Sequence, residues 1–120
     1  MSETPLFALP TNLRLYPVAF FLPGERYAEL SDLKIPANVQ LHANHLLYIK
    51  ERIEKGDMLL ATPILGPDAP VHAIGVYRED YDGGRIAALM DADPAVIARR
   101  YVYRIQSALF PSLQQIHVEY

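Results

Sequence analysis

The stretch that decides the fold is residues 42–63, HANHLLYIKERIEKGDMLLATP, in which an amphipathic pattern leads into a short apolar run. Its period predicts a helix that begins near Pro36 and ends at Gly56. One face of this helix is expected to be buried, and it carries His42, Leu46, Ile49 and Ile53. His45 falls about 60° to one side of that face. We therefore expect His42 in the core or lining a pocket, and His45 facing a pocket.

Other short apolar runs predict strands at residues 13–22, 58–62, 71–77 and 101–110, with a further strand at 113–118. A second helix should reach residue 91, with Asp80 or Asp82 as its N-cap. Asp93 has the form of an N-cap for a short helical turn at residues 95–100.

The remaining segments read as an arm and loops. Residues 1–12 form an N-terminal arm, residues 23–34 a loop with one helical turn, and residues 64–70 a hairpin loop. Pro17 lies inside the first strand and has no N–H to donate, so we expect a bulge there or an edge position for the strand.

The order of elements is strand, helix, strand, strand, helix, strand. This order predicts an α+β fold of the ferredoxin-like βαββαβ type, an antiparallel sheet with two helices on one face, in a single domain at residues 13–120. The other face of the sheet must also be covered. In a chain of 120 residues a second copy is the economical cover, so we expect a homodimer or a higher oligomer.

Composition excludes several classes of protein. The chain has no cysteine, 51% hydrophobic residues and a net charge of −3, which excludes disulfides and gives no electrostatic basis for nucleic-acid binding. No apolar run approaches the roughly 18 residues that span a bilayer, and the first residues lack the pattern of a signal peptide. We expect a cytoplasmic protein that binds neither membrane nor nucleic acid.

Several short pieces occur in an order that resembles the YCII-related domain family: Pro23-Gly24, Tyr27, His45-x-x-Tyr48, Gly56, Pro63 and Asp93-Pro94-x-Val96. The resemblance covers roughly residues 13–111. It implies a dimeric α+β barrel in which two sheets pack face to face, with His45 and Asp93 as a catalytic dyad. One branch of the family resembles small dehydrochlorinases that act on chlorinated hydroxyquinols, and the barrel is similar to that of muconolactone isomerases.

The chain departs from the family pattern at two positions. Thr62 stands before Pro63 where the family has glycine, and Arg99 stands where a glycine often follows the Asp-Pro pair. Both positions are expected at the rim of the pocket, so they bear on the choice of substrate.

A histidine beside a carboxylate has a clear chemical logic. Asp93 would fix the tautomer of His45 and stabilise its protonated form, so that His45 abstracts a proton from a phenol or from carbon next to a carbonyl. This predicts a small cofactor-independent lyase or isomerase, or a dehydrochlorinase-like enzyme, acting on a small cyclic or aromatic compound. Four residues are candidates for substrate binding: Tyr48, His42, Thr62 and Arg99.

Structural roles compete with each of these assignments. Asp93 can act as an N-cap, Tyr48 as a packing residue, and paired Arg99 and Arg100 as solvated surface charges. His42 and His45 could face a common metal, but no third ligand is placed by the sequence, and we expect no metal. The alternative to an enzyme is a non-catalytic dimeric barrel that binds a small molecule or accompanies another protein.

Overall fold

The computed structural model describes residues 13–66, 68–111 and 113. The predicted arm at residues 1–12 lies outside the described residues, as does nearly all of the strand predicted at 113–118. The helices and strands are, in chain order, β1 (Leu13–Pro23), α1 (Tyr27–Leu30), α2 (Pro36–Glu54), β2 (Met58–Pro63), β3 (Ala73–Tyr77), α3 (Gly83–Asp91), α4 (Pro94–Ile97) and β4 (Tyr101–Pro111).

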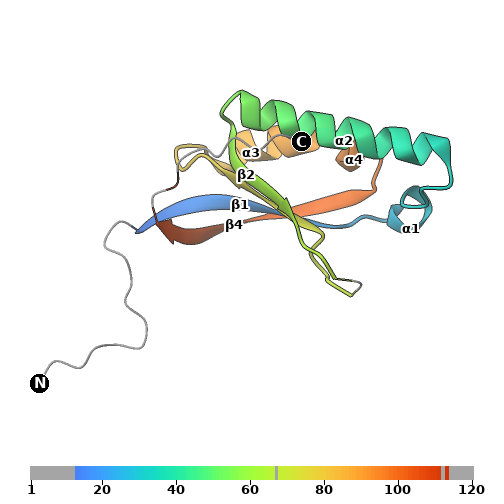
Figure 1. Cartoon of the computed structure of the whole chain (residues 1–120). Coiled ribbons are helices and arrows are strands. Elements are labelled where there is room, and N and C mark those ends of the chain that lie inside the picture. The colour runs from blue at the N-terminus through green and yellow to red at the C-terminus, as the bar shows by residue number, and fades with distance from the viewer. Residues whose placement is uncertain (1–12, 67, 112, 114–120) are drawn as a thin grey trace, which may run out of the picture.

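The four strands form one antiparallel sheet in the order β2-β3-β1-β4. Helices α2, α3 and α4 lie together on one side of this sheet (Figure 1). The strand order and the one-sided helices confirm the predicted α+β class and are compatible with a ferredoxin-like fold. No helix in the described part of the chain is long and apolar enough to span a membrane.

The expectation for Pro17 was wrong, because β1 is a central strand and passes Pro17 in continuous register with β4. Pro17 pairs with Ser107, while the pairing of β1 with β3 begins one residue later, at Val18 opposite Val76. Pro17 thus lies just beyond the β3 ladder. On that side its missing N–H costs no hydrogen bond, which is how a central strand accommodates it.

Helix α2 begins and ends where the sequence predicted. Pro36 occupies its first turn, and Gly56 follows its end with φ of +81°, a conformation that glycine adopts at little cost. Asn38 is buried, and its side-chain amide donates to the carbonyls of Glu29 (2.8 Å) and Asp32 (3.0 Å). These two bonds fix the loop around α1 against the start of α2.

The buried face of α2 differs from the predicted one. Its buried residues are Asn38, His45, Ile49 and Ile53. Leu46, predicted to be buried, is 52% exposed, and His45 lies within the buried face instead of beside it. Ile49 and Ile53 belong both to the predicted face and to a face that contains His45, and the packing of α2 on the sheet and α4 selects the face with His45.

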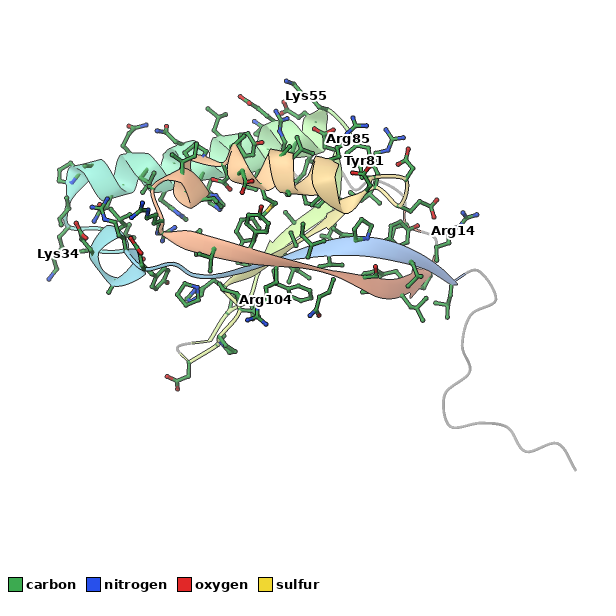
Figure 2. All side chains as sticks on the ribbon, turned by 180° about the vertical axis from the view of Figure 1, so that it is seen from behind. Arg14, Lys34, Lys55, Tyr81, Arg85 and Arg104 are labelled. Atoms are coloured by element: carbon green, nitrogen blue, oxygen red, sulfur yellow. The ribbon has the colours of Figure 1, made fainter. Side chains whose placement is uncertain are left out.

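The core lies between the helices and the sheet. Its largest fully buried apolar side chains are Phe21, Met58, Tyr77, Ile86 and Met90. Tyr101, Tyr103 and Ile105 of β4 also pack on this side, so residues 102 and 104 point to the opposite face. Figure 2 shows Arg104 on the side of the sheet away from the helices.

The loop after β1 is held tightly against the turn between α4 and β4. Gly24 N–H donates to the carbonyl of Arg100 (2.8 Å), and Arg26 N–H donates to the carbonyl of Arg99 (3.0 Å). A Cβ atom at position 24 would overlap the carbonyl oxygen of Arg99. Arg99 itself has φ of +66° at this turn. Only glycine allows the two backbones to approach so closely.

We predict that Gly24→Ala lowers the free energy of unfolding by about 1–3 kcal/mol, because the added methyl group must push two backbone segments apart. Urea denaturation followed by circular dichroism measures this. Gly83→Ala is the matched control, since no atom lies within 4 Å of the position its Cβ would take. The control should leave stability unchanged or raise it by up to about 1 kcal/mol. Equal stability of the two variants would contradict the close approach.

Candidate functional site

The centre of the site is a buried pair formed by His45 of α2 and Asp93 at the start of α4. The Nδ1 atom of His45 lies 2.7 Å from Oδ2 of Asp93 and 2.9 Å from Oδ1. The Asp93 residue is fully buried, and His45 is 6% exposed. The sequence had placed these two residues together only through the family resemblance, and the structure brings them into direct contact.

Asp93 is held in place by its second role as the N-cap of α4. Its Oδ1 atom accepts a hydrogen bond from the backbone N–H of Ala95 at 2.9 Å, and Pro94 occupies the first turn. The predicted capping role is therefore confirmed. The carboxylate of Asp93 accepts hydrogen bonds from both the helix backbone and His45, and the two bonds together fix its position.

The pairing determines which nitrogen of His45 is available for chemistry. An ionised carboxylate can only accept hydrogen bonds, so Nδ1 carries the hydrogen and Nε2 holds the free lone pair of the neutral ring. In the described part of the chain, the only buried side-chain polar atom without a hydrogen-bond partner is Nε of Arg52. The unpartnered Nε2 of His45 is therefore accessible.

His45 forms part of the wall of a pocket between α2 and the β2–β3 hairpin. The pocket has a volume of about 310 Å³, near the lower end of the range of small-molecule sites. It is lined by Phe21, His42, His45, Leu46, Ile49, Ala61, Thr62, Pro63, His72, Ala73, Ile74 and Tyr101. This lining is mainly apolar, contains no carboxylate, and carries its polar atoms on three histidines, one threonine and one tyrosine.

Aromatic rings hold the imidazole of His45 on two sides. The ring centroids of Phe21 and Tyr101 lie 5.6 Å and 5.5 Å from that of His45. Phe21 meets the imidazole edge to face. Because the ring is packed in this way and hydrogen bonded at Nδ1, its Nε2 has a fixed direction.

His42, one turn before His45, has a different partner. The Nη1 atom of Arg100 lies 3.1 Å from Nδ1 of His42, and the two imidazole rings stack with centroids 6.1 Å apart. Burial, followed by the charge of Arg100 and the neighbouring His45, lowers the pKa of His42 below its ordinary value of 6.5. His42 therefore lines the pocket as a neutral ring.

Arg100 is the residue that sequence reasoning missed. The expectation of solvated arginines describes Arg99, which is exposed and pairs with Glu25 at 2.6 Å, but it was wrong for Arg100, which is 6% exposed. The guanidinium of Arg100 lies 4.8 Å from the ring centroid of Tyr101 and donates from Nε to Ser31 at 3.3 Å. The sequence does not distinguish the two adjacent arginines. The turn at Arg99 leaves the side chain of Arg99 exposed and buries that of Arg100.

Two of the four predicted substrate-binding residues line the pocket, and two do not. His42 and Thr62 are in the wall. Tyr48 is half-buried elsewhere, with its hydroxyl donating to the carbonyl of Leu89 at 2.6 Å. Arg99 sits on the exposed turn before β4 and is not among the lining residues.

His72 is a further lining residue to which the sequence gave no role. Its Nδ1 lies 3.2 Å from the hydroxyl of Tyr27, and the two ring centroids are 4.5 Å apart. A single histidine at the start of a strand has no diagnostic spacing, so only the fold reveals this position. In the part of the chain that the structure describes, no three His, Asp or Glu side chains are grouped to hold a metal ion.

Comparisons with protein-family models, with curated proteins and with solved structures give no match to this chain.

We predict that His42 titrates with a midpoint below 6.5, as measured by NMR of the histidine rings. Because the folded-state pKa is lowered, the unfolded chain takes up the proton more readily, and stability is lost as the pH falls below about 6.5. The free energy of unfolding of the native protein should thus fall relative to His42→Gln between about pH 8 and about pH 5. A midpoint at or above 6.5, with parallel stability curves, would contradict the assignment.

Proposed function

We propose that the protein is a small cofactor-independent enzyme that moves protons on a small cyclic or aromatic compound, as a lyase or an isomerase. The observation that carries this proposal is the 2.7 Å contact between Nδ1 of His45 and the buried carboxylate of Asp93, with Nε2 of the same ring left accessible at a pocket. A histidine oriented in this way is suited to general base catalysis near neutral pH.

The reaction begins with a substrate C–H bond next to a carbonyl group or with a phenolic O–H. His45 takes the proton at Nε2 and becomes an imidazolium ion, and Asp93 stabilises that charge through Nδ1–H. The electron pair left on the substrate moves to its oxygen. Return of the proton to another carbon completes an isomerisation, whereas loss of a leaving group from the neighbouring carbon completes an elimination.

The pocket and the order of motifs support a substrate of this class. A mainly apolar cavity of about 310 Å³ suits a single ring, and it contains no carboxylate that would repel an anionic intermediate. The same His-Asp pair is what a resemblance to the YCII-related family implies, and we propose membership of that type. Thr62 in the pocket wall is then a position at which this chain would select a different substrate.

We predict that His45→Gln and Asp93→Asn each lower catalysed proton exchange by about 10²–10⁴-fold. The asparagine amide would donate to Nδ1 and move the hydrogen of His45 to Nε2, which removes the free lone pair. A panel of cyclic ketones and lactones in D₂O, followed by proton NMR, detects exchange at carbon next to the carbonyl.

Asp91→Asn is the matched control for Asp93→Asn, since it makes the same change at an exposed carboxylate that accepts from Tyr103. It should leave the exchange rate unchanged. Exchange that is equally fast in the native protein and in His45→Gln would overturn the role of His45. Tight binding of panel compounds without any exchange would favour the alternative, a barrel that only binds its ligand.

We also propose that the sheet pairs face to face with a second copy of the chain, as a dimeric α+β barrel. Among the described residues, the buried side chains on the sheet face opposite the helices form a small cluster of Tyr16, Val18 and Val76. Partly exposed apolar residues surround that cluster, including Phe20, Ile74, Ala108 and Phe110. Val102 is 48% exposed, and its place in β4 puts it on this face. A second sheet would cover these side chains.

We predict that Val102→Glu shifts the protein from dimer to monomer in sedimentation equilibrium, because a charge would be buried between the sheets. Val39→Glu is a close control, since Val39 is also 48% exposed but lies on α2. The control should remain a dimer. If both variants sediment as the native protein does, the sheet face is not the interface.

A further inference from the structure

The two histidines of the pocket have polar partners of opposite charge. His45 is backed by the carboxylate of Asp93, whereas His42 is backed by the guanidinium of Arg100. Both rings come from α2, three residues apart, and both line the same cavity. The base proposed above uses only His45, and nothing in that role accounts for His42 or for a buried arginine behind it.

The partner of His42 determines its tautomer. A guanidinium has only N–H donors, so Nδ1 of His42 must accept the hydrogen bond from Arg100, and the hydrogen of the neutral ring is on Nε2. His45 has the reverse arrangement, with its hydrogen on Nδ1. The pocket therefore holds one imidazole that can accept a proton at Nε2 and one that can donate a hydrogen bond from Nε2.

Arg100 has no negatively charged partner within the part of the chain that the structure describes. Among the described residues it forms no ion pair with a carboxylate, although it is only 6% exposed. Its guanidinium contacts His42, the hydroxyl of Ser31 and the rings of Tyr27 and Tyr101. A buried cation is costly unless a negative charge lies close by, so this side of the pocket favours an anion.

We propose that His42 is the hydrogen-bond donor for the substrate oxygen that becomes negatively charged, and that Arg100 is the positioning residue that holds His42 in its Nε2–H form. This inference rests on the proposed function and specifies its substrate class. The substrate carries a carbonyl group next to the carbon that loses its proton.

The two histidines then act on two atoms of one molecule, the carbon that loses its proton and the oxygen of the carbonyl group beside it. The C–H bond breaks as its proton bonds to Nε2 of His45, the electron pair forms the new C=C bond, and the carbonyl π pair becomes a lone pair on oxygen. That oxygen accepts the Nε2–H of His42 more strongly as its charge grows, which lowers the barrier to proton removal. A neutral donor does this without giving its own proton to the enolate.

The tautomers can be tested on the native protein. NMR of histidines labelled with ¹⁵N should show His42 as the Nε2–H form and His45 as the Nδ1–H form at a pH where both rings are neutral. Arg100→Met should abolish the preference of His42, while Arg100→Lys, which retains a donor, should keep it. Two rings with the same tautomer, or a preference that survives Arg100→Met, would overturn the positioning role.

The probe for binding is 4-nitrophenol, because its phenolate is a ring-sized anion with a distinct absorption spectrum. The native protein should bind the phenolate in preference to the neutral phenol, and His42→Phe should weaken phenolate binding about 10- to 100-fold. His42→Gln, with an amide donor, should recover part of the affinity. Binding of 4-nitroanisole, which has the same ring but no charge, should be equal in the native protein and His42→Phe.

Phenolate binding is also measured in His45→Gln, with and without His42→Phe, so that the role of His42 is tested apart from that of His45. Phenolate binding that depends on His42 should persist there, even if no compound of the exchange panel reacts. If proton exchange depends on His45 but His42→Phe binds phenolate as the native protein does, the inference fails and the base assignment stands. Circular dichroism of each variant confirms that it is folded.

Discussion

The site depends on one carboxylate, that of Asp93, which is bonded to two parts of the chain at once. It accepts from the backbone N–H of Ala95 and from Nδ1 of His45. The first bond fixes the carboxylate relative to α4, and the second fixes α4 relative to α2. A fully buried charge would destabilise the fold if either partner were lost. The same carboxylate therefore joins α4 to α2 and orients the imidazole of His45. A substitution that removes the carboxylate would lose both contacts.

The two histidines of the pocket differ because each contacts a side chain of opposite charge. The carboxylate of Asp93 lies at Nδ1 of His45, whereas the guanidinium of Arg100 lies at Nδ1 of His42. A histidine by itself has no fixed tautomer, since the neutral ring has two tautomers of similar energy. The fold selects one tautomer for each ring. A pair of side chains of the same type can therefore supply opposite functions within one small cavity.

The order of elements could be predicted from the sequence because turn and cap residues mark the ends of the periodic stretches. Pro36, Gly56 and the Asp93-Pro94 pair all stand where helices begin or end. The rotation of α2 could not be predicted in the same way. Two overlapping rows of residues fit one amphipathic pattern, and Leu46 belongs to the row that tertiary packing did not select. Contacts between distant segments, such as Arg100 with His42, have no local signal.

The site is built from two short segments, residues 42–45 on one helix and residues 93–100 around another. Helix geometry fixes the spacing of the two imidazoles, and their charged partners stand just before and shortly after α4. The β2–β3 hairpin supplies the opposite wall, including Thr62 and His72, but contacts neither charged partner through a hydrogen bond in the described structure. Substitutions in the hairpin can therefore change which molecules fit the pocket while the contacts of His45 with Asp93 and of His42 with Arg100 stay the same. In such an architecture, the shape of the pocket can evolve independently of the two histidines and their charged partners.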